Sequence, residues 1–256
     1  MLSFIVPAHN EELLLGATLD AIRNAAELLG EPYELIVVDD ASTDQTAFVA
    51  RNCGARVISV ANRQISATRN SGAHAAKGEL LVFVDADTRV DGDVVRAAVQ
   101  AVRDGAVGGG AAIKFDGTVP LYAHLLLPIL IRTFRAKRLA AGCFVFCTKS
   151  AFLAVGGFDE AYYGAEEIVF SRALRRQGRF VVLRLAVTTS GRKLRTYSAW
   201  EILTMMFRVA RQGRKGVQRR QGLELWYGER RADPQRDAPV VARRRKADAS
   251  LPGSRD

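Results

Sequence analysis

The sequence predicts an α/β fold in which a mostly parallel central sheet is flanked by helices within a single domain. Short runs of Val, Ile, Leu and Phe alternate along the chain with longer segments whose apolar residues recur at helical spacing. Several of the early runs also end abruptly at polar residues, Asp above all. Because right-handed crossovers bring the carboxyl ends of parallel strands to one edge of a sheet, these polar residues are expected to converge there.

The first part of the chain is expected to contain four strands separated by helices. Residues 3–6, 34–38, 55–60 and 80–84 are short apolar, β-branched runs of strand length. Pro7 closes the first of them, and residues 10–12 open a helix on which Leu15, Leu19 and Ile22 share one face. Further helices are expected at residues 46–52 and 62–76, the second of which ends at Gly78.

The second part continues with strands at residues 111–115, 142–147 and 180–188. Amphipathic or mixed helices are expected at residues 91–103, 149–155, 166–178 and 197–211, and the last of these has Trp200, Leu203 and Phe207 on one side. The triple glycine at residues 108–110 predicts a turn or a closely packed backbone. A phosphate cradle is disfavoured there because no Lys-Ser/Thr pair follows.

Residues 121–138 form a mostly apolar segment with two alternative placements. The segment is interrupted by Pro128 and ends in Arg135, Lys137 and Arg138. It could pack on the sheet, or it could lie on a membrane face with its basic end at the headgroups. Packing on the sheet is the preferred prediction.

The net charge of +10 is confined to the C-terminal quarter. Residues 1–191 contain 20 basic and 20 acidic side chains, whereas the rest of the chain contains 17 basic and 7 acidic ones. Such a tail can meet anionic lipid headgroups, nucleic acid or the phosphates of a substrate, and charge alone does not select among them. Residues 230–256 lack any apolar period and are predicted to be disordered.

The cysteines and the apolar segments indicate the cellular compartment of the protein. Three cysteines are too few for a disulfide framework, and Cys143-x-x-x-Cys147 has no partner pair or nearby His for zinc. No signal peptide is recognised, and no apolar run reaches the roughly 18 to 20 residues of a membrane span. The sequence therefore predicts a cytoplasmic protein, and its basic tail adds the hypothesis of a peripheral place on the inner membrane face.

Asp85 and Asp87 end the strand of residues 80–84 with a single Ala between them. Two carboxylates held this close repel each other unless a cation or a shared proton offsets their charge. Oxygen ligands at a strand end suit Mg²⁺ or Mn²⁺, which take their remaining ligands from waters and substrate phosphates. The alternative interpretation is that Asp85 begins a turn and Asp87 caps the next helix.

The ordered set of motifs resembles the family-2 glycosyltransferases with a GT-A fold, which are nucleotide-diphospho-sugar transferases. Four stretches carry the resemblance over about residues 2–195, and no Gly-x-Gly-x-x-Gly of a dinucleotide-binding dehydrogenase follows the first strand. They are Phe4 to Glu12, Val37 to Asp44, Arg69 to Gly72 with Asp85-Ala86-Asp87, and Gly156 to Glu160 with Glu166-Glu167.

The resemblance implies a division of the chain. Residues 1–195 would be the glycosyltransferase domain, with a nucleotide-binding half at 1–88 and an acceptor half at 89–195. Residues 196–229 would be an amphipathic basic helical region, and residues 230–256 the disordered tail.

The resemblance also assigns a nucleotide-sugar site. Pro7, Ala8 and Glu11 would line the nucleotide pocket, although a Pro turn before an acidic helical turn is the alternative. Asp40 would face the base or ribose with Asp39 nearby, unless both simply cap the following helix.

The basic residues of that site are expected to contact the donor. By resemblance Arg69 would contact the base or the diphosphate, and its alternative is a solvated helix-face charge. Arg192 and Arg195 would be cationic clamps on the diphosphate, or else part of a solvated basic loop.

For catalysis the resemblance implies a metal and a base. Asp87 would ligate Mn²⁺ or Mg²⁺ directly, and Asp85 would reach the ribose or a metal-bound water. Glu167, next to Glu166, would take the proton of the acceptor hydroxyl in an inverting transfer. The common Glu-Asp-x-Asp pattern is altered here, because Glu167 replaces the first Asp and Val169 the second. Acidic residues that favour a helix N-terminus are the alternative.

The resulting prediction is a metal-dependent inverting glycosyltransferase that uses a nucleoside-diphosphate sugar, UDP-linked, and a hydroxyl acceptor that could be lipid-linked. A nucleotidyltransferase on a related fold is one alternative. A membrane-binding or nucleic-acid-binding module with a degenerate catalytic site is another. A nucleic-acid partner is not expected, because the body is neutral and has no aromatic-rich basic face.

Overall fold

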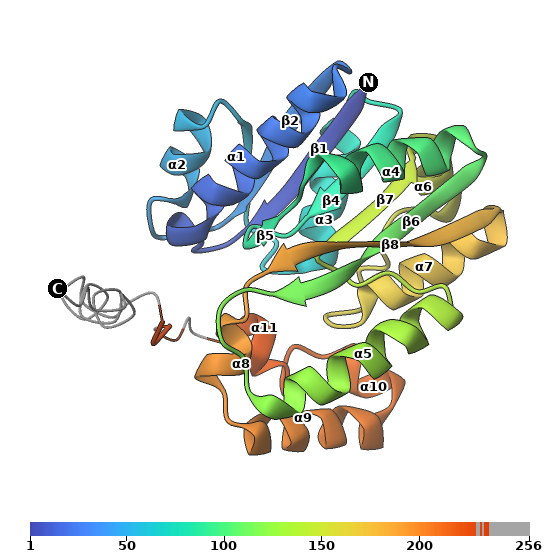
Figure 1. The fold of residues 1–256 in the computed structure, drawn as a ribbon. Helices are drawn as coiled ribbons and strands as arrows, with labels where there is room; N and C mark the ends of the chain where they lie inside the picture. The colour runs from blue at the N-terminus through green and yellow to red at the C-terminus, as the bar shows by residue number, and fades with distance from the viewer. Residues whose placement is uncertain (229–230, 232, 236–256) are drawn as a thin grey trace, which may run out of the picture.

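The structure is a computed structural model that describes residues 1–228, 231 and 233–235 (Figure 1). The predicted α/β fold is confirmed: the described residues form an eight-stranded mixed sheet in the order β3-β2-β1-β4-β7-β6-β8-β5. Strands β1 to β4 are parallel neighbours, and β7 pairs antiparallel with both β4 and β6. The strands are β1 Leu2–Ala8, β2 Tyr33–Asp40, β3 Arg56–Val60, β4 Leu80–Val84, β5 Thr88–Arg89, β6 Ala106–Phe115, β7 Phe144–Thr148 and β8 Arg179–Thr189.

Two apolar cores cover the two faces of the sheet. Helices α1 (Glu12–Leu29), α2 (Thr46–Asn52) and α4 (Gly92–Arg103) pack on one face, where they bury residues such as Leu19 and Val95. Helices α3 (Ile65–Ala75), α6 (Lys149–Val155) and α7 (Glu166–Gln177) pack on the other, where Phe83 meets Phe158 and Phe170. Both faces of the parallel strands are therefore buried, which explains their continuous apolar runs.

The alternation of side chains along β2 separates its two terminal carboxylates. Val37 belongs to the core beneath α1, whereas Ile36 and Val38 belong to the core beneath α3. Since successive residues of a strand point to opposite faces, Asp40 is on the α3 face and Asp39 on the α1 face. Adjacent acidic residues thus have different surroundings.

The triple glycine at residues 108–110 lies inside β6 and is not a turn. A Cβ at Gly109 would come 2.4 Å from the carbonyl oxygen of Val181 and 2.5 Å from the Phe146 ring. The closely packed backbone was therefore the correct alternative, because only glycine permits β7 and β8 to approach β6 this closely. The strand predicted at residues 111–115 accordingly begins earlier, at Ala106.

Residues 121–138 contact the sheet at β8, as the preferred prediction expects, but only part of the segment is covered. Helix α5 (Leu121–Ala136) buries Ala123 but leaves a row of large apolar side chains exposed. On the same side of the molecule, α9 (Ala199–Gln212) also exposes large apolar residues (Figure 1). Across the described part of the chain, no helix combines the length and apolarity that crossing a membrane would need. The exposed residues are Leu121, Leu125, Leu126, Ile129 and Leu130 on α5, and Trp200, Leu203 and Phe207 on α9.

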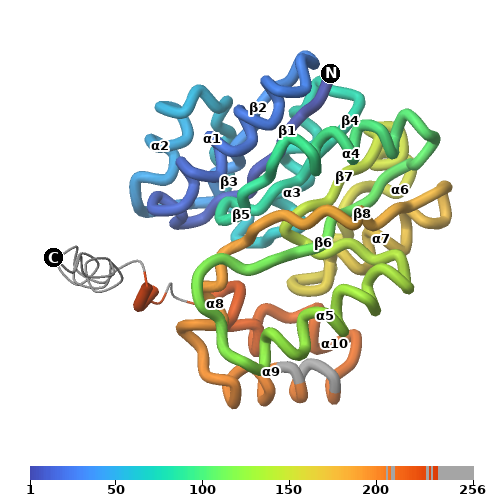
Figure 2. The backbone as a smooth tube through the Cα atoms, in the orientation of Figure 1, coloured from blue at the N-terminus to red at the C-terminus, as the bar shows by residue number. Residues whose placement is uncertain are grey.

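The basic C-terminal region returns to the body of the protein (Figure 2). It forms α8 (Arg192–Thr196), α9, α10 (Arg214–Val217) and α11 (Glu224–Tyr227). The carbonyl oxygen of Val217 accepts hydrogen bonds from the amides of Tyr163 (2.8 Å) and Gly164 (3.2 Å), just before α7. The Tyr227 ring lies edge-on to Tyr163, with centroids 5.8 Å apart. The disorder predicted for residues 230–256 falls almost entirely outside the described residues.

Candidate active site

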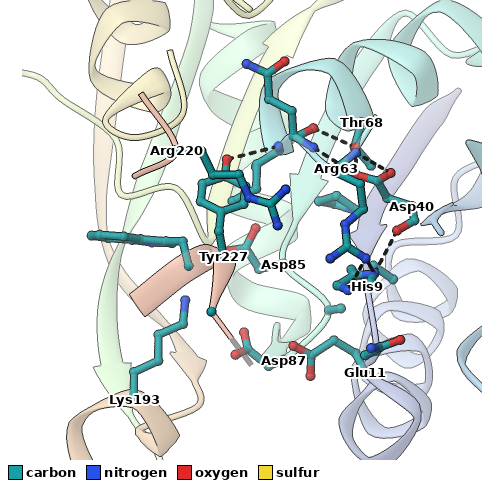
Figure 3. Close-up of a pocket in the computed structure, with 18 of the residues that line it drawn as sticks. His9, Glu11, Asp40, Arg63, Thr68, Asp85, Asp87, Lys193, Arg220 and Tyr227 are labelled. Atoms are coloured by element: carbon teal, nitrogen blue, oxygen red, sulfur yellow. Dashed lines mark hydrogen bonds between the residues drawn. The ribbon is translucent and has the colours of Figure 1, made fainter. Parts of the chain in front are cut away.

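A cavity of about 390 Å³ opens at the carboxyl ends of β1, β2 and β4 (Figure 3). Parallel strands deliver their polar ends to this edge, as the sequence predicted. Pro7 is tolerated in β1 because β4 pairs with that strand only as far as Ile5, so the missing N–H is not required there. The predicted site residues that line the cavity are Pro7, Ala8, Glu11, Asp40, Asp85 and Asp87.

Asp40 organises one wall of this cavity. Its Oδ1 accepts from the amide of Arg63 (2.7 Å), and its Oδ2 accepts from the amide of Gln64 (3.1 Å) and the hydroxyl of Thr68 (2.7 Å). Gln64 is the N-cap residue of α3, so the carboxylate satisfies donors at a helix start that would otherwise lack partners. Asp40 therefore connects the end of β2 to the start of α3.

Asp39 does not line the cavity. Its carboxyl is buried on the opposite face of β2, and Oδ1 has no hydrogen-bond partner among the described residues. Its role toward the nucleotide stays a prediction.

Asp85 and Asp87 project into the cavity beside Glu11 (Figure 3). Desolvation by burial, reinforced by the charge of Glu11, raises the pKa of Asp87 to about 6. This crowding of carboxylates is what a bound cation would offset, and their hard oxygen atoms fit Mg²⁺ or Mn²⁺. Within the described part of the chain, no group of three or more His, Cys, Asp or Glu side chains forms a complete metal site. A cation held here would need further ligands from water or substrate.

Arg69 is buried at the centre of an ionic network. Its guanidinium donates to Glu166 Oε1 (2.8 Å), Asp85 Oδ1 (2.8 Å) and the carbonyl oxygen of Gly142 (2.9 Å). Its side chain is 2% exposed and is not among those that line the 390 Å³ cavity. These contacts position two carboxylates, and the donor contact expected of Arg69 stays a prediction.

Glu166 and Glu167 begin α7 but have different surroundings. Glu166 is buried and paired with Arg69, whereas the carboxylate of Glu167 has no ion pair with the described residues and lies near Gly142. Desolvation by burial, with the charge of Glu166 second, raises the pKa of Glu167 to about 8. Ala165, which precedes them, has a φ of 58°, a strained conformation for Ala that recurs at functional sites. Of the two glutamates, Glu167 is therefore the one without an ion pair among the described residues.

A second cavity, of about 320 Å³, contains both glutamates and adjoins the first. Ile65, Asp85 and Trp226 border both cavities, so the two spaces meet where β4 ends. Glu167 lines the second cavity, which shares these three residues with the first.

The expected clamp residues Arg192 and Arg195 bind carboxylates of the protein. Arg192 makes a two-pronged ion pair with Glu11 (2.9 and 3.3 Å), and Arg195 pairs with Asp116 (3.2 Å) and Asp233 (2.6 Å). Lys193, which lies between them, is the basic residue of α8 that lines the 390 Å³ cavity (Figure 3). Helical spacing explains this, because residues three apart share a face and Lys193 is turned about 100° from Arg192.

Several residues of the cavity were missed by the sequence analysis. His9 Nδ1 lies 2.8 Å from the carbonyl oxygen of Asp40, and Arg63 contacts His9 Nε2 at 2.8 Å. From α11, the hydroxyl of Tyr227 accepts from the amide of Ile65 at 3.4 Å. The sequence carried no signal for the residues after position 213, because their approach to the site depends on the return of the C-terminal region. The additional lining residues include His9, Arg63, Gln64, Thr68, Lys193, Arg220, Trp226 and Tyr227.

Comparisons with known proteins agree with this architecture. An undecaprenyl-phosphate 4-deoxy-4-formamido-L-arabinose transferase of Edwardsiella ictaluri is 30% identical over 115 residues, which are 40% of this chain and 34% of that protein. The chain thus spans about a third of that relative.

Two solved structures share the fold. A mannosyltransferase from Pyrobaculum calidifontis, in complex with GDP-Man and Mn²⁺, aligns with a TM-score of 0.63 at 18% identity over 99% of this chain and 76% of the other. Staphylococcus aureus TarS 1–349, in complex with UDP-GlcNAc, aligns with a TM-score of 0.58 at 20% identity over 83% and 66%. Both likenesses establish the fold, which is that of the GT-A glycosyltransferases.

The family is established by the sequence itself. The profile described as glycosyl transferase family 2 matches residues 3–160, more than half of the chain. These residues include the strand ends that build the 390 Å³ cavity, from Pro7 to Asp87. This chain belongs to glycosyl transferase family 2.

Proposed function

We propose that this glycosyltransferase moves a sugar from a UDP-linked donor to a hydroxyl acceptor, with inversion and with a divalent metal. The observation that carries the proposal is a pair of adjoining cavities. The first, which we call the nucleotide cavity, is lined by Asp85 and Asp87, and the second contains the carboxylate of Glu167. A donor in the first cavity would present its anomeric carbon at their junction. An acceptor in the second would approach from the opposite side, as inversion requires.

The residues of the chain would divide the work. Asp85 and Asp87 would hold Mn²⁺ or Mg²⁺, which when bound supplies charge neutralisation at the leaving diphosphate. Lys193 would place a further positive charge on the same diphosphate. Glu167 would accept the acceptor proton, and its pKa of about 8 suits a base near neutral pH. Arg69 would keep Asp85 and Glu166 in place.

A product assay tests this function. The full chain is first screened by thermal shift against UDP-, GDP- and dTDP-sugars with and without Mn²⁺, because a bound ligand raises the apparent stability. Turnover with the selected donor should then release the nucleoside diphosphate. Release of pyrophosphate would instead indicate a nucleotidyltransferase. Binding without any sugar transfer, together with unchanged behaviour of Asp87→Asn, would refute the proposal.

We also propose that the protein associates peripherally with anionic membranes. Support comes from the exposed Trp200 (75%) and Phe207 (70%) on α9, and from the excess of basic residues after Gly191. The relative of Edwardsiella ictaluri is named for a lipid-linked acceptor, which agrees with this location.

Sedimentation with phosphatidylglycerol vesicles at low salt tests the association. Trp200→Ser with Phe207→Ser should weaken it, whereas Phe48→Ser on the remote helix α2, also exposed (57%), should not. The proposed membrane association would be contradicted if the vesicles retained the Trp200/Phe207 double variant and the Phe48→Ser variant equally, or if they did not retain the wild type.

A further inference from the structure

The 320 Å³ cavity beside Glu167 has mainly apolar walls. Helix α5 and the segment after it supply one side, and β6 supplies the other. Such walls gain free energy when they cover apolar surface and leave sugar hydroxyls without partners. The apolar residues that matter for this argument are Ile113, Phe115, Leu130, Ile131, Phe134 and Leu139.

The charged residues of the cavity exclude an anionic occupant. Among the described residues that line it, Arg69 is the one cation. Its two terminal nitrogens bind Glu166 and Asp85, so two carboxylates offset its charge, and its Nε has no partner among the described residues. Glu167 adds another carboxyl group. A phosphate monoester carries a charge of about −1.5 to −2 near neutral pH, so it would meet acidic groups without a free cation to offset them. A cation held at Asp85 and Asp87 would be matched by the diphosphate of the donor.

The position of Glu167 favours an alcohol. A hydroxyl group must lose a proton as it attacks, whereas an ionised phosphate oxygen needs no base. The unpaired carboxylate of Glu167 lies in this cavity next to its junction with the nucleotide cavity. A base placed here is useful only to a neutral nucleophile.

The apolar wall continues to the surface. Leu130 lines the cavity and is 45% exposed, and Leu126 and Ile129 on the same helix are exposed as well. An apolar chain longer than the cavity would therefore leave along α5 and stay in contact with apolar side chains. Leu126 lies one helical turn from Leu130, so apolar side chains continue along α5 beyond the cavity.

We propose that this cavity is the acceptor site and that it takes a neutral alcohol carried on an apolar body, rather than a phosphate monoester or a polar sugar. The proposal rests on the glycosyltransferase function given above. In the transfer, the acceptor oxygen forms a bond to the anomeric carbon and the bond from that carbon to the diphosphate oxygen breaks. The electron pair leaves with the diphosphate, and the hydroxyl proton goes to Glu167.

Three probes of matched design test the site. Farnesol and farnesyl phosphate share one apolar body and differ in the nucleophile, whereas glycerol has hydroxyls without an apolar body. Binding to the full chain is measured by calorimetry with saturating UDP and Mn²⁺. We expect farnesol to bind at least about tenfold more tightly than farnesyl phosphate, and glycerol to show no binding. Tighter binding of the phosphate, or equal binding of glycerol, would overturn the proposal.

Variants on and off the cavity wall locate the binding. Ile131→Asn should weaken farnesol binding about tenfold, because a buried apolar contact is lost. Leu153→Asn, on the remote helix α6 and exposed (57%), should leave it unchanged. Ala112→Leu fills the cavity without a polar group and should also weaken it, which keeps the test decisive if Ile131→Asn fails to fold.

Binding of UDP distinguishes a failure of the proposed acceptor site from a failure of the proposed glycosyltransferase function. All variants should retain it, because the nucleotide cavity shares none of the substituted residues. If the wild type did not bind UDP, the proposed function would be refuted and the farnesol comparison would remain valid. Farnesol binding that is unaffected by both Ile131→Asn and Ala112→Leu would refute the acceptor site and leave the glycosyltransferase function standing.

Discussion

Replacement of Arg69 by methionine should be among the most destabilising single changes in this protein. Methionine keeps much of the length and apolar stem of arginine but removes the guanidinium that binds Glu166 Oε1 and Asp85 Oδ1, both at 2.8 Å. The side chain of Glu166 is 7% exposed and would then be a buried carboxylate without its cation. Removing one partner of a buried ion pair costs about 3 to 5 kcal/mol, so the free energy of unfolding should fall by that amount near neutral pH.

Urea denaturation followed by circular dichroism measures the effect. The matched control is Arg96→Met, since Arg96 is an exposed arginine (57%) whose partner Asp93 is also exposed. Its change should stay below about 0.5 kcal/mol, as for most surface substitutions. Adding Glu166→Gln to Arg69→Met should restore part of the stability, because the uncompensated charge is gone. If Arg69→Met changed the free energy of unfolding no more than the control does, the ion pairs of Arg69 would not contribute the stability predicted here.

Three further outcomes are expected. Burial raises the folded pKa of Glu167 to about 8, above its ordinary value of 4.5, so its ionisation destabilises the fold as the pH rises between these values. Glu167→Gln should therefore lose turnover yet gain melting temperature relative to wild type at about pH 9, and equal melting temperatures there would contradict this. Turnover of the wild type should increase as the pH rises through about 8, since the base must be ionised, and a flat profile would exclude Glu167 as the base. Lys193→Ala should weaken UDP binding about tenfold and reduce its salt dependence, whereas Lys114→Ala, exposed and outside both cavities, should change neither in calorimetry.

The strand ends were predictable because their signals are local. Each apolar run of β1, β2 and β4 stops at a polar residue, and the geometry of parallel strands then brings Pro7, Asp40 and Asp85 to one edge. The separate environments of Asp39 and Asp40 follow from the same two-residue period, once the cores on each face are known.

The contacts of the charged side chains were not predictable in the same way. Arg69 and Glu166 are 97 residues apart in the chain, and Arg192 and Glu11 are 181 apart. No local pattern indicates which carboxylate a buried arginine will meet, so a family resemblance that assigns arginines to the diphosphate cannot tell a ligand contact from an internal pair. Lys193 was overlooked because the resemblance pointed to its neighbours.

The buried network around Arg69 gives two adjacent glutamates different contacts. At the start of α7 they would repel each other if both were ionised in a buried site. Arg69 binds Glu166 and makes no ion pair with Glu167, so the two chemically identical side chains have different partners. This difference would let Glu167 act as the proposed base in an altered acidic motif. The same guanidinium binds Asp85, which borders both cavities. One buried cation therefore connects the residue after β4 to the helix of the proposed base, and we expect any change that moves Asp85 to alter the position of Glu167 as well.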